Sequence, residues 1–307
     1  MVEVSAIVLA GIMAGSSVQA TNVSVEADAG PGDHTSEIQA WRKQRVDRLK
    51  TPTGWLSLVG LHWLKDGEQT VGSGKDNDND VVLNVGPARL GKVTLKNGDA
   101  SIALDAKAGA KIDGADKVAA PLVDDRQEKP TTISFGTANF YVIDRDGKKA
   151  LRVKDSEAAT RKNFLGIDYY DIAAKWRIEA KWEAFDPPRT LEVPTVLGTV
   201  EKYPVPGKAT FEIGGKKYEI TPVIEVPGDK ELFIIFADRT SGKETYGAGR
   251  FLYAPMPANG KIVLDFNKAY NPPCAFTPYA TCPLAPPENR LDLPVTAGEK
   301  KYRGSHH

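Results

Sequence analysis

Two aspartates and one arginine in the C-terminal part of the sequence have the types and positions that could support catalysis. Asp238 and Asp265 each close an apolar segment, and Arg250 lies on a third segment between them. A carboxylate and a guanidinium that meet at strand ends form a bidentate, charge-assisted pair. Such a pair is either a structural clamp or part of a site, with Asp265 as general base and Arg250 as clamp for an anion or oxyanion. Asp238 is the third catalytic candidate.

Two asparagines follow Asp265 and would support such a site as orienting amides. In a strand, Asn267 shares a face with Asp265, because side chains two residues apart point the same way. Asn271 follows in a proline-braced segment. If the shared face is buried, Asp265 needs a cationic partner to stay ionised, and we expect Arg250 to be that partner.

Three candidate ligand-binding residues lie outside this segment. Trp63 and Tyr246 could hold a sugar or another flat ligand, although a tryptophan in a β protein more often packs in the core. His62 precedes Trp63 in an apolar stretch, where a hydrogen-bonded core histidine is the more common outcome. Each of the three is therefore a candidate contact with core packing as its alternative.

The cysteine and histidine counts limit the other chemistries. Cys274 and Cys282 are the only cysteines, and in an oxidising compartment a disulfide between them would contribute roughly 2.5 kcal/mol. A nucleophilic or metal-binding thiol is the alternative. Residues 304–307 resemble the start of a purification tag, which leaves His34 and His62 and excludes a three-histidine metal site.

Motifs of well-known hydrolases and metal sites are missing from the sequence. It contains no Gly-x-Ser-x-Gly, His-Glu-x-x-His or Cys-x-x-Cys motif. The acidic loop Lys75–Asp80 departs from the EF-hand pattern, with Val81 at position six and Pro87 at position twelve. We therefore expect no metal and no cofactor.

One helix is expected near the N-terminus. Ser36 and Gln39 form a capping-box pair, and Ile38 begins a near-helical apolar spacing. Because Pro52 cannot continue a helix, we expect the helix to lie between Ser36 and Lys50.

After this helix, the apolar period changes to two. Apolar and charged residues alternate strictly from Trp176 to Ala184, and turn dipeptides such as Asn97-Gly98 mark hairpins. Leu232–Phe236 is apolar on both faces, which is typical of a central strand. The predicted fold class is mostly β, an antiparallel β-sandwich or barrel-like architecture with one N-terminal helix.

The chain divides into five expected segments. A short apolar run followed by Val18-Gln19-Ala20 has the pattern of a signal peptide, which predicts a periplasmic or secreted protein. Asp186-Pro187-Pro188 is the best candidate for a break between two β units. The segments are 1–20 signal peptide, 21–37 flexible linker, 38–185 helix plus N-terminal β unit, 186–303 C-terminal β unit and 304–307 tag remnant.

Charge and hydropathy exclude two classes of partner. The 307 residues include 40 basic and 40 acidic side chains, and a balanced charge disfavours nucleic acid and anionic membrane surfaces. A membrane span is not expected, because no apolar segment reaches the length of about 20 residues that a bilayer requires. A small-molecule or saccharide ligand is the partner that we expect.

Short motifs spread over the β region resemble one known family. They are Gly54–Leu58, Leu61–Leu64, Tyr246-Gly247-x-Gly249-Arg250, Leu264–Asn267, Asn271–Phe276, Cys282-Pro283 and Glu288–Leu291. Together they resemble the uncharacterised bacterial family DUF1684 over about residues 38–300. The resemblance implies no particular activity. It also implies that a disulfide is not obligatory, because not all members keep both cysteines.

Three functional hypotheses follow from these residues. The first is a hydrolase of a small polar or ester-like substrate, built around Asp238, Arg250 and Asp265. The second is a non-catalytic envelope protein that binds a glycan or small ligand at Trp63 and Tyr246, and the third is a structural or interaction module. A pocket lined by Asp265 and Arg250 would favour the first two, whereas a closed ion pair would favour the third.

Overall fold

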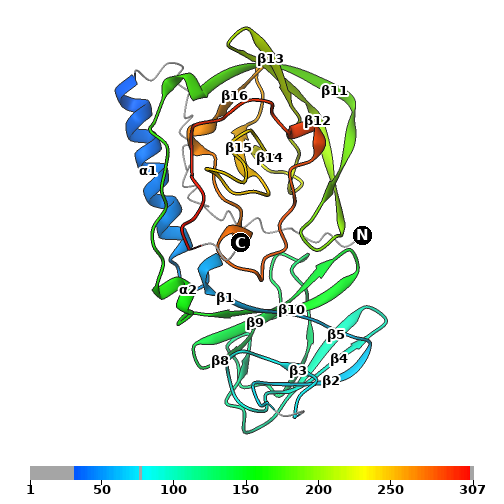
Figure 1. The fold of residues 1–307 in the computed structure, drawn as a ribbon. Helices are drawn as coiled ribbons and strands as arrows, with labels where there is room; N and C mark the ends of the chain where they lie inside the picture. The colour runs from blue at the N-terminus through cyan, green and yellow to red at the C-terminus, as the bar shows by residue number, and fades with distance from the viewer. Residues whose placement is uncertain (1–30, 76–77, 305–307) are drawn as a thin grey trace, which may run out of the picture.

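The computed structural model describes residues 31–75 and 78–304, which form two β-rich parts (Figure 1). The N-terminal part, residues 58–155, lies at the bottom of Figure 1, and the C-terminal part lies above it beside the long helix. Strands account for 44% and helices for 13%, which confirms the mostly β fold with one main helix near the N-terminus. The expected signal peptide, residues 21–30 of the linker and residues 305–307 lie outside the described residues.

The main helix, α1 (Pro31–Leu49), begins earlier than the sequence suggested. It includes residues 31–37, which we had assigned to the flexible linker. Pro31 suits a first helical turn, and Asp33 and Arg48 complement the helix dipole at its two ends. The early start also has a tertiary cause, because the side chain of His34 is buried in a hydrogen bond to the C-terminal part.

The N-terminal part consists of two five-stranded sheets that share one hydrophobic core. The sheet orders are β1-β10-β9-β8-β6 and β3-β2-β4-β5-β7, and only the β2–β3 pair is parallel among the described strands. Val93 of one sheet and Phe140 of the other both belong to the shared core. The strands are β1 (Leu58–Trp63), β2 (Gly67–Gly72), β3 (Val81–Val82), β4 (Gly91–Lys96), β5 (Asp99–Leu104), β6 (Lys111–Ile112), β7 (Ala119–Leu122), β8 (Ile133–Phe135), β9 (Ala138–Arg145) and β10 (Lys148–Asp155).

The C-terminal part is built on a four-stranded sheet and a separate hairpin. The sheet has the order β13-β12-β11-β16, and the hairpin pairs β14 with β15. Ile234 of β14 packs in one hydrophobic core and Phe233 in another, which confirms that this strand is covered on both faces. The strands are β11 (Arg177–Pro194), β12 (Val200–Ile213), β13 (Lys216–Ile220), β14 (Glu231–Phe236), β15 (Arg250–Pro255) and β16 (Lys261–Asp265).

The expected break at Asp186-Pro187-Pro188 does not separate two units. These residues lie inside β11, where the register to β12 shifts between Ala184 and Arg189. A proline has no backbone N–H for a sheet, and a shift in register is a place where that loss is tolerated. The chain instead leaves the N-terminal part after β10.

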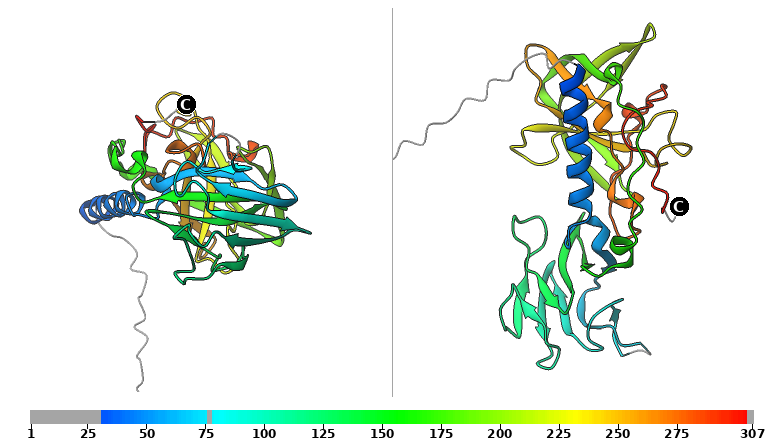
Figure 2. Two further views of the ribbon diagram at one scale, coloured as in Figure 1. Left: turned by 90° about the horizontal axis from the view of Figure 1, so that it is seen from below. Right: turned by 90° about the vertical axis from the view of Figure 1, so that its left-hand side faces the viewer.

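Short helical turns connect the strands, and the C-terminal segment after β16 has little regular structure. Figure 2 shows α1 along the outside of the C-terminal part, with the N-terminal part beyond its C-terminal end. No helix of the described residues is both long and apolar enough to cross a membrane. The short elements are α2 (Ala159–Lys162), η1 (Trp55–Ser57), η2 (Ala174–Trp176), η3 (Phe266–Lys268), η4 (Pro273–Ala275) and η5 (Pro287–Asn289).

Candidate functional site

Asp238 and Arg250 form a closed structural clamp. Arg250 begins β15, and its Nη2 lies 2.7 Å from Oδ2 of Asp238, which follows β14; both side chains are 0% exposed. The same guanidinium donates to the carbonyl oxygens of Val295 at 2.9 Å, of Glu299 at 3.3 Å and of Ala297. It therefore ties the hairpin to the C-terminal segment and is sealed from solvent.

Asp265 has other partners than the expected Arg250. As the last residue of β16, it caps the turn η3 by accepting a hydrogen bond from the backbone N–H of Asn267 at 3.2 Å. Its other oxygen lies 2.7 Å from Nε2 of His34, and Nη1 of Arg177 is 3.6 Å away. The predicted pair of Asp265 with Arg250 is wrong, because both terminal nitrogens of Arg250 already bond Asp238 or backbone carbonyls.

The two predicted orienting amides, Asn267 and Asn271, form hydrogen bonds with backbone groups. Asn267 donates to Asp265 at 2.9 Å, and its side chain also bonds both backbone groups of Ala173. Asn271 donates to the carbonyl of Lys300 at 2.8 Å. Both asparagines are fully buried, so they fix the position of Asp265 and of the C-terminal segment.

Asp265 lines a cleft of about 860 Å³ along the side of α1. Residues of α1 form one wall, and residues of β14, β15 and the segment after β16 form another. The lining includes Glu37, Trp41 and Arg48 from the helix and Phe233 and Tyr253 from the hairpin. Of the three residues that the sequence marked as catalytic, Asp265 lines this cleft and Asp238 and Arg250 do not.

Aromatic rings form the middle of the cleft. The ring centroids of Trp41 and Tyr270 are 6.3 Å apart, and Tyr253 stacks on Tyr270 at the same distance with an interplanar angle of 16°. Phe233 packs on Tyr253 at 5.1 Å. Arg45 lies over Tyr270 at 4.6 Å from its centroid, so the rings carry a cation on one face. Trp41, Tyr253 and Tyr270 are each only partly buried.

Glu225 is the carboxyl of the cleft whose protonation the fold alters. It accepts a hydrogen bond from the hydroxyl of Tyr253, and desolvation raises the pKa of Glu225. Desolvation is also the main cause that raises the pKa of Tyr253. Glu225 nevertheless keeps an exposed side chain, so solvent screens part of this effect.

His62 and Trp63 lie on β1 of the N-terminal part and do not line the cleft. Nε2 of His62 is buried without a hydrogen-bond partner among the described residues, and desolvation lowers the pKa of His62. Trp63 is 38% exposed on the same strand. The structure thus separates these two residues from Asp265.

Cys274, Cys282 and Tyr246 lie together in a hydrophobic core. Both thiols are free, and each accepts a hydrogen bond from the other residue's backbone N–H, at 3.1 Å and 3.4 Å. A hydrogen bond from the Cys282 thiol lowers the pKa of Cys274, whereas desolvation raises the pKa of Cys282 well above its usual value. Burial raises the pKa of Tyr246 to about 12.

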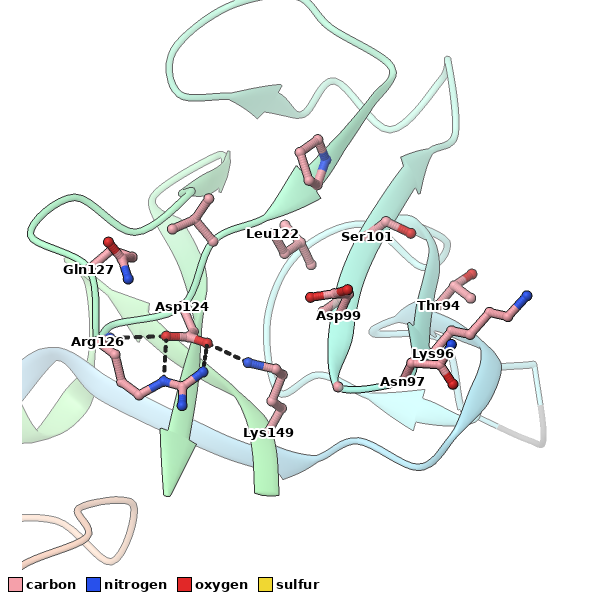
Figure 3. A pocket seen from close by; sticks show the side chains of 14 residues that line it. Thr94, Lys96, Asn97, Asp99, Ser101, Leu122, Asp124, Arg126, Gln127 and Lys149 are labelled. Atoms are coloured by element: carbon pink, nitrogen blue, oxygen red, sulfur yellow. Dashed lines mark hydrogen bonds and ion pairs between the residues drawn. The ribbon is translucent and has the colours of Figure 1, made fainter. Parts of the chain in front are cut away.

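A second cluster of charges, missed by the sequence analysis, borders another pocket of about 650 Å³ in the N-terminal part. Figure 3 shows Arg126 and Lys149 pointing toward Asp124. Nζ of Lys149 also lies 3.1 Å from Asp144, and a side-chain hydrogen bond from Arg126 holds the pKa of Asp124 well below its usual value. Two cations and two carboxylates satisfy one another here, so this cluster presents no free charge.

Comparisons with known proteins give a family for the C-terminal part. Residues 162–300 match the family described as protein of unknown function (DUF1684), which is the family that the sequence resembles over the longer range of about residues 38–300. No curated protein matches the chain. A solution NMR structure of an uncharacterized protein of Haloarcula marismortui is 29% identical, with a TM-score of 0.39, over 46% of this chain and 78% of that chain.

Proposed function

We propose that this protein binds a small-molecule or saccharide ligand in the cleft between α1 and the β14–β15 hairpin. The observation that carries the proposal is the row of half-buried rings of Trp41, Tyr253 and Tyr270 inside the cleft. Partly open rings bury the flat face of a ligand, and charged groups beside them give it hydrogen bonds. The volume of about 860 Å³ lies within the range of small-ligand sites.

The clamp of Asp238 and Arg250 has no part in this function. Its closed geometry supports the structural alternative for these two residues, whereas Asp265 is buried but lines the cleft, which supports the site alternative for it. Asp265 already accepts three hydrogen bonds, from His34 and twice from Asn267. We therefore assign it the role of a fixed negative charge that positions a ligand.

Hydrolysis of a small polar or ester-like substrate is the second candidate function, and Glu225 favours it. A carboxyl whose pKa is raised inside a ligand cleft is suited to donate a proton to a leaving group. Water would then attack the substrate carbon as the leaving group departs with the proton of Glu225, and the attacking water would give one of its own protons back to the Glu225 carboxylate. The general acid in this proposal is Glu225, and no catalytic role falls to Arg250.

The test of binding compares two tryptophans. Isothermal titration calorimetry with a panel of neutral and acidic saccharides should find a ligand whose affinity falls at least about tenfold in Trp41→Ala. Trp63→Ala is the matched control, because Trp63 is an exposed tryptophan outside the cleft. Equal losses in both variants, or binding that neither variant changes, would exclude this cleft.

The test of hydrolysis uses a broad hydrolase screen on the purified protein, with and without EDTA. Any activity should disappear in Glu225→Gln and persist in Glu212→Gln, which removes a carboxylate from the exposed face of β12. Activity that survives Glu225→Gln would refute the assigned general acid.

Export and a Cys274–Cys282 disulfide complete the proposal. The contacts between the two residues support the pairing, because each backbone N–H already reaches the other sulfur. Titration of thiols in denatured, non-reduced protein from an oxidising compartment should then find almost none. Two reactive thiols in that protein would refute the disulfide.

A further inference from the structure

The cleft carries cations without carboxylate partners at the C-terminal end of α1. Lys154 of β10 lines the cleft, and its Nζ donates to the carbonyl of Thr53 at 2.8 Å. Arg48, in the last turn of α1, lines the same cleft with an exposed side chain. Across residues 31–75 and 78–304, no carboxylate oxygen lies within 4.0 Å of a side-chain nitrogen of Lys154 or Arg48.

A third cation lies behind these two. Arg152 shares a face of β10 with Lys154, because they are two residues apart on one strand. It is 3% exposed, its guanidinium lies 5.7 Å from the ring of Trp55, and its Nη2 donates to the Thr281 hydroxyl at 2.9 Å. Within the described structure it has no carboxylate partner, and its Nε has no partner at all. The pKa of Lys154 is lowered by desolvation and then by Arg152, as expected for unpaired neighbouring cations.

Near the N-terminal half of α1, two carboxylates and two cations that line the cleft pair with one another. Glu37 pairs with Lys268 and lies 3.5 Å from Arg177, which is itself 3.6 Å from Asp265. Glu37 and Arg48 are separated along the helix by about 16 Å, at 1.5 Å per residue. The aromatic row, with Trp41 on the helix, lies between these two ends.

We infer that the ligand of this cleft carries an anionic group, a carboxylate or a phosphate, which binds between Arg48 and Lys154 while the rest of the ligand lies on the aromatic row. This inference rests on the proposed binding function. An anion stabilises two cations that lack carboxylate partners, and most of all the partly buried Lys154, whereas a neutral ligand would leave both uncompensated. The ligand class is thus an acidic saccharide or another flat molecule with an acidic substituent.

Two fluorescent probes that differ by one anionic group distinguish recognition of an anion from binding in the cleft in general. Anilinonaphthalene sulfonate carries a naphthyl ring and an anion, and phenylnaphthylamine has the same rings without the anion. Both should bind the folded protein, and Trp41→Ala should weaken both. Lys154→Met and Arg48→Gln should each weaken the sulfonate about three- to tenfold and leave the neutral probe unchanged.

The control variant is Lys43→Gln, which removes a positive charge from the same helix where Lys43 pairs with Asp47 on the exposed side. It should change neither affinity. Thermal melts identify any variant that loses its fold. If Lys154→Met is unstable, Arg48→Gln alone carries the test, because Arg48 is exposed.

Competition then distinguishes the two sources of the anion. Displacement of the sulfonate probe by galacturonate, with galactose ineffective, supports a carboxylate, and displacement by inorganic phosphate supports a phosphate. If Lys154→Met and Arg48→Gln leave the sulfonate affinity unchanged while Trp41→Ala lowers it, the anionic inference is wrong and cleft binding stands. If Trp41→Ala changes neither probe, both are wrong.

Discussion

Two aspartate–arginine pairs of the C-terminal part, Asp238 with Arg250 and Asp265 with Arg177, have opposite environments. In the clamp, Asp238 and Arg250 are fully buried, and three backbone carbonyls accept from the same guanidinium. In the cleft, Asp265 is buried but faces the hollow, and its neighbour Arg177 is exposed. Residue type and strand-end position therefore do not distinguish a sealed pair from a pair that borders a cleft.

The carbonyl partners explain why one pair is closed. A guanidinium has five N–H donors, and a single carboxylate cannot satisfy them in a dry interior. The segment that carries Val295 and Ala297 supplies acceptors to both terminal nitrogens of Arg250, whereas its Nε has no partner among the described residues. Arg177 has no need of such acceptors, because solvent satisfies its remaining donors.

The largest expected effect comes from opening the clamp. Arg250→Gln should lower the free energy of unfolding by about 3 to 5 kcal/mol, because it leaves the carboxylate of Asp238 buried without its cation. Urea unfolding followed by fluorescence measures the change. A variant that cannot be obtained in folded form would also indicate a large loss of stability. A loss below about 1 kcal/mol would mean that the clamp is not sealed.

Asp265→Asn should have an intermediate effect on stability. The amide keeps one acceptor oxygen but loses the charge that His34 and Arg177 face, so we expect a loss of about 1 to 2 kcal/mol. The same urea experiment measures it, and calorimetry with a cleft ligand should show weaker binding. Stability lost to the same extent as in Arg250→Gln would make Asp265 a second structural clamp.

Arg177→Gln makes the same arginine-to-glutamine change in the pair of Arg177 with Asp265. Because Arg177 is exposed and its contacts with Asp265 and Glu37 are long, the loss should stay below about 1 kcal/mol. Added salt should reduce the difference from the wild type further. A loss equal to that of Arg250→Gln would abolish the contrast between the two regions.

His62 lies outside both regions and should affect stability least, and only in acid. Desolvation lowers the pKa of His62 in the folded state below the ordinary value of 6.5. As the pH falls through 6.5, the unfolded state therefore binds its proton first, and the wild type loses stability.

His62→Gln should remove this part of the acid sensitivity and leave ligand binding in the cleft unchanged. The measurement is the free energy of unfolding of both proteins at about pH 7.5 and about pH 5, two values on either side of the titration of His62. A variant that is as acid-sensitive as the wild type would contradict the desolvated environment of His62.

Several parts of the fold could be predicted from local sequence. The burial of both faces of Leu232–Phe236 and the main helix followed from apolar spacing, because the burial of a face dictates which positions are apolar. Asp186-Pro187-Pro188 was predicted as a boundary and lies within β11, since prolines mark a shift in register as well as a loop.

The candidate site could be predicted only in part. Asp265 was marked as a site residue and lines the cleft, but Glu225, Tyr253 and Tyr270 were not singled out. One usable signal was Tyr253, the only residue between Arg250 and Ala254 of β15 that is not buried. The cleft itself depends on α1 packing beside the hairpin, a contact between segments about 200 residues apart that no local pattern records.

The sequence by itself determined which segments are strands, which faces are apolar and which charged residues stand at strand ends. Those properties depend on neighbours one or two positions away. The tertiary structure decided that Arg250 pairs with Asp238 and that His34 and Arg177 approach Asp265. Pairing of buried charges depends on distance and desolvation in three dimensions, and these arise only when the helix and both strands are packed together.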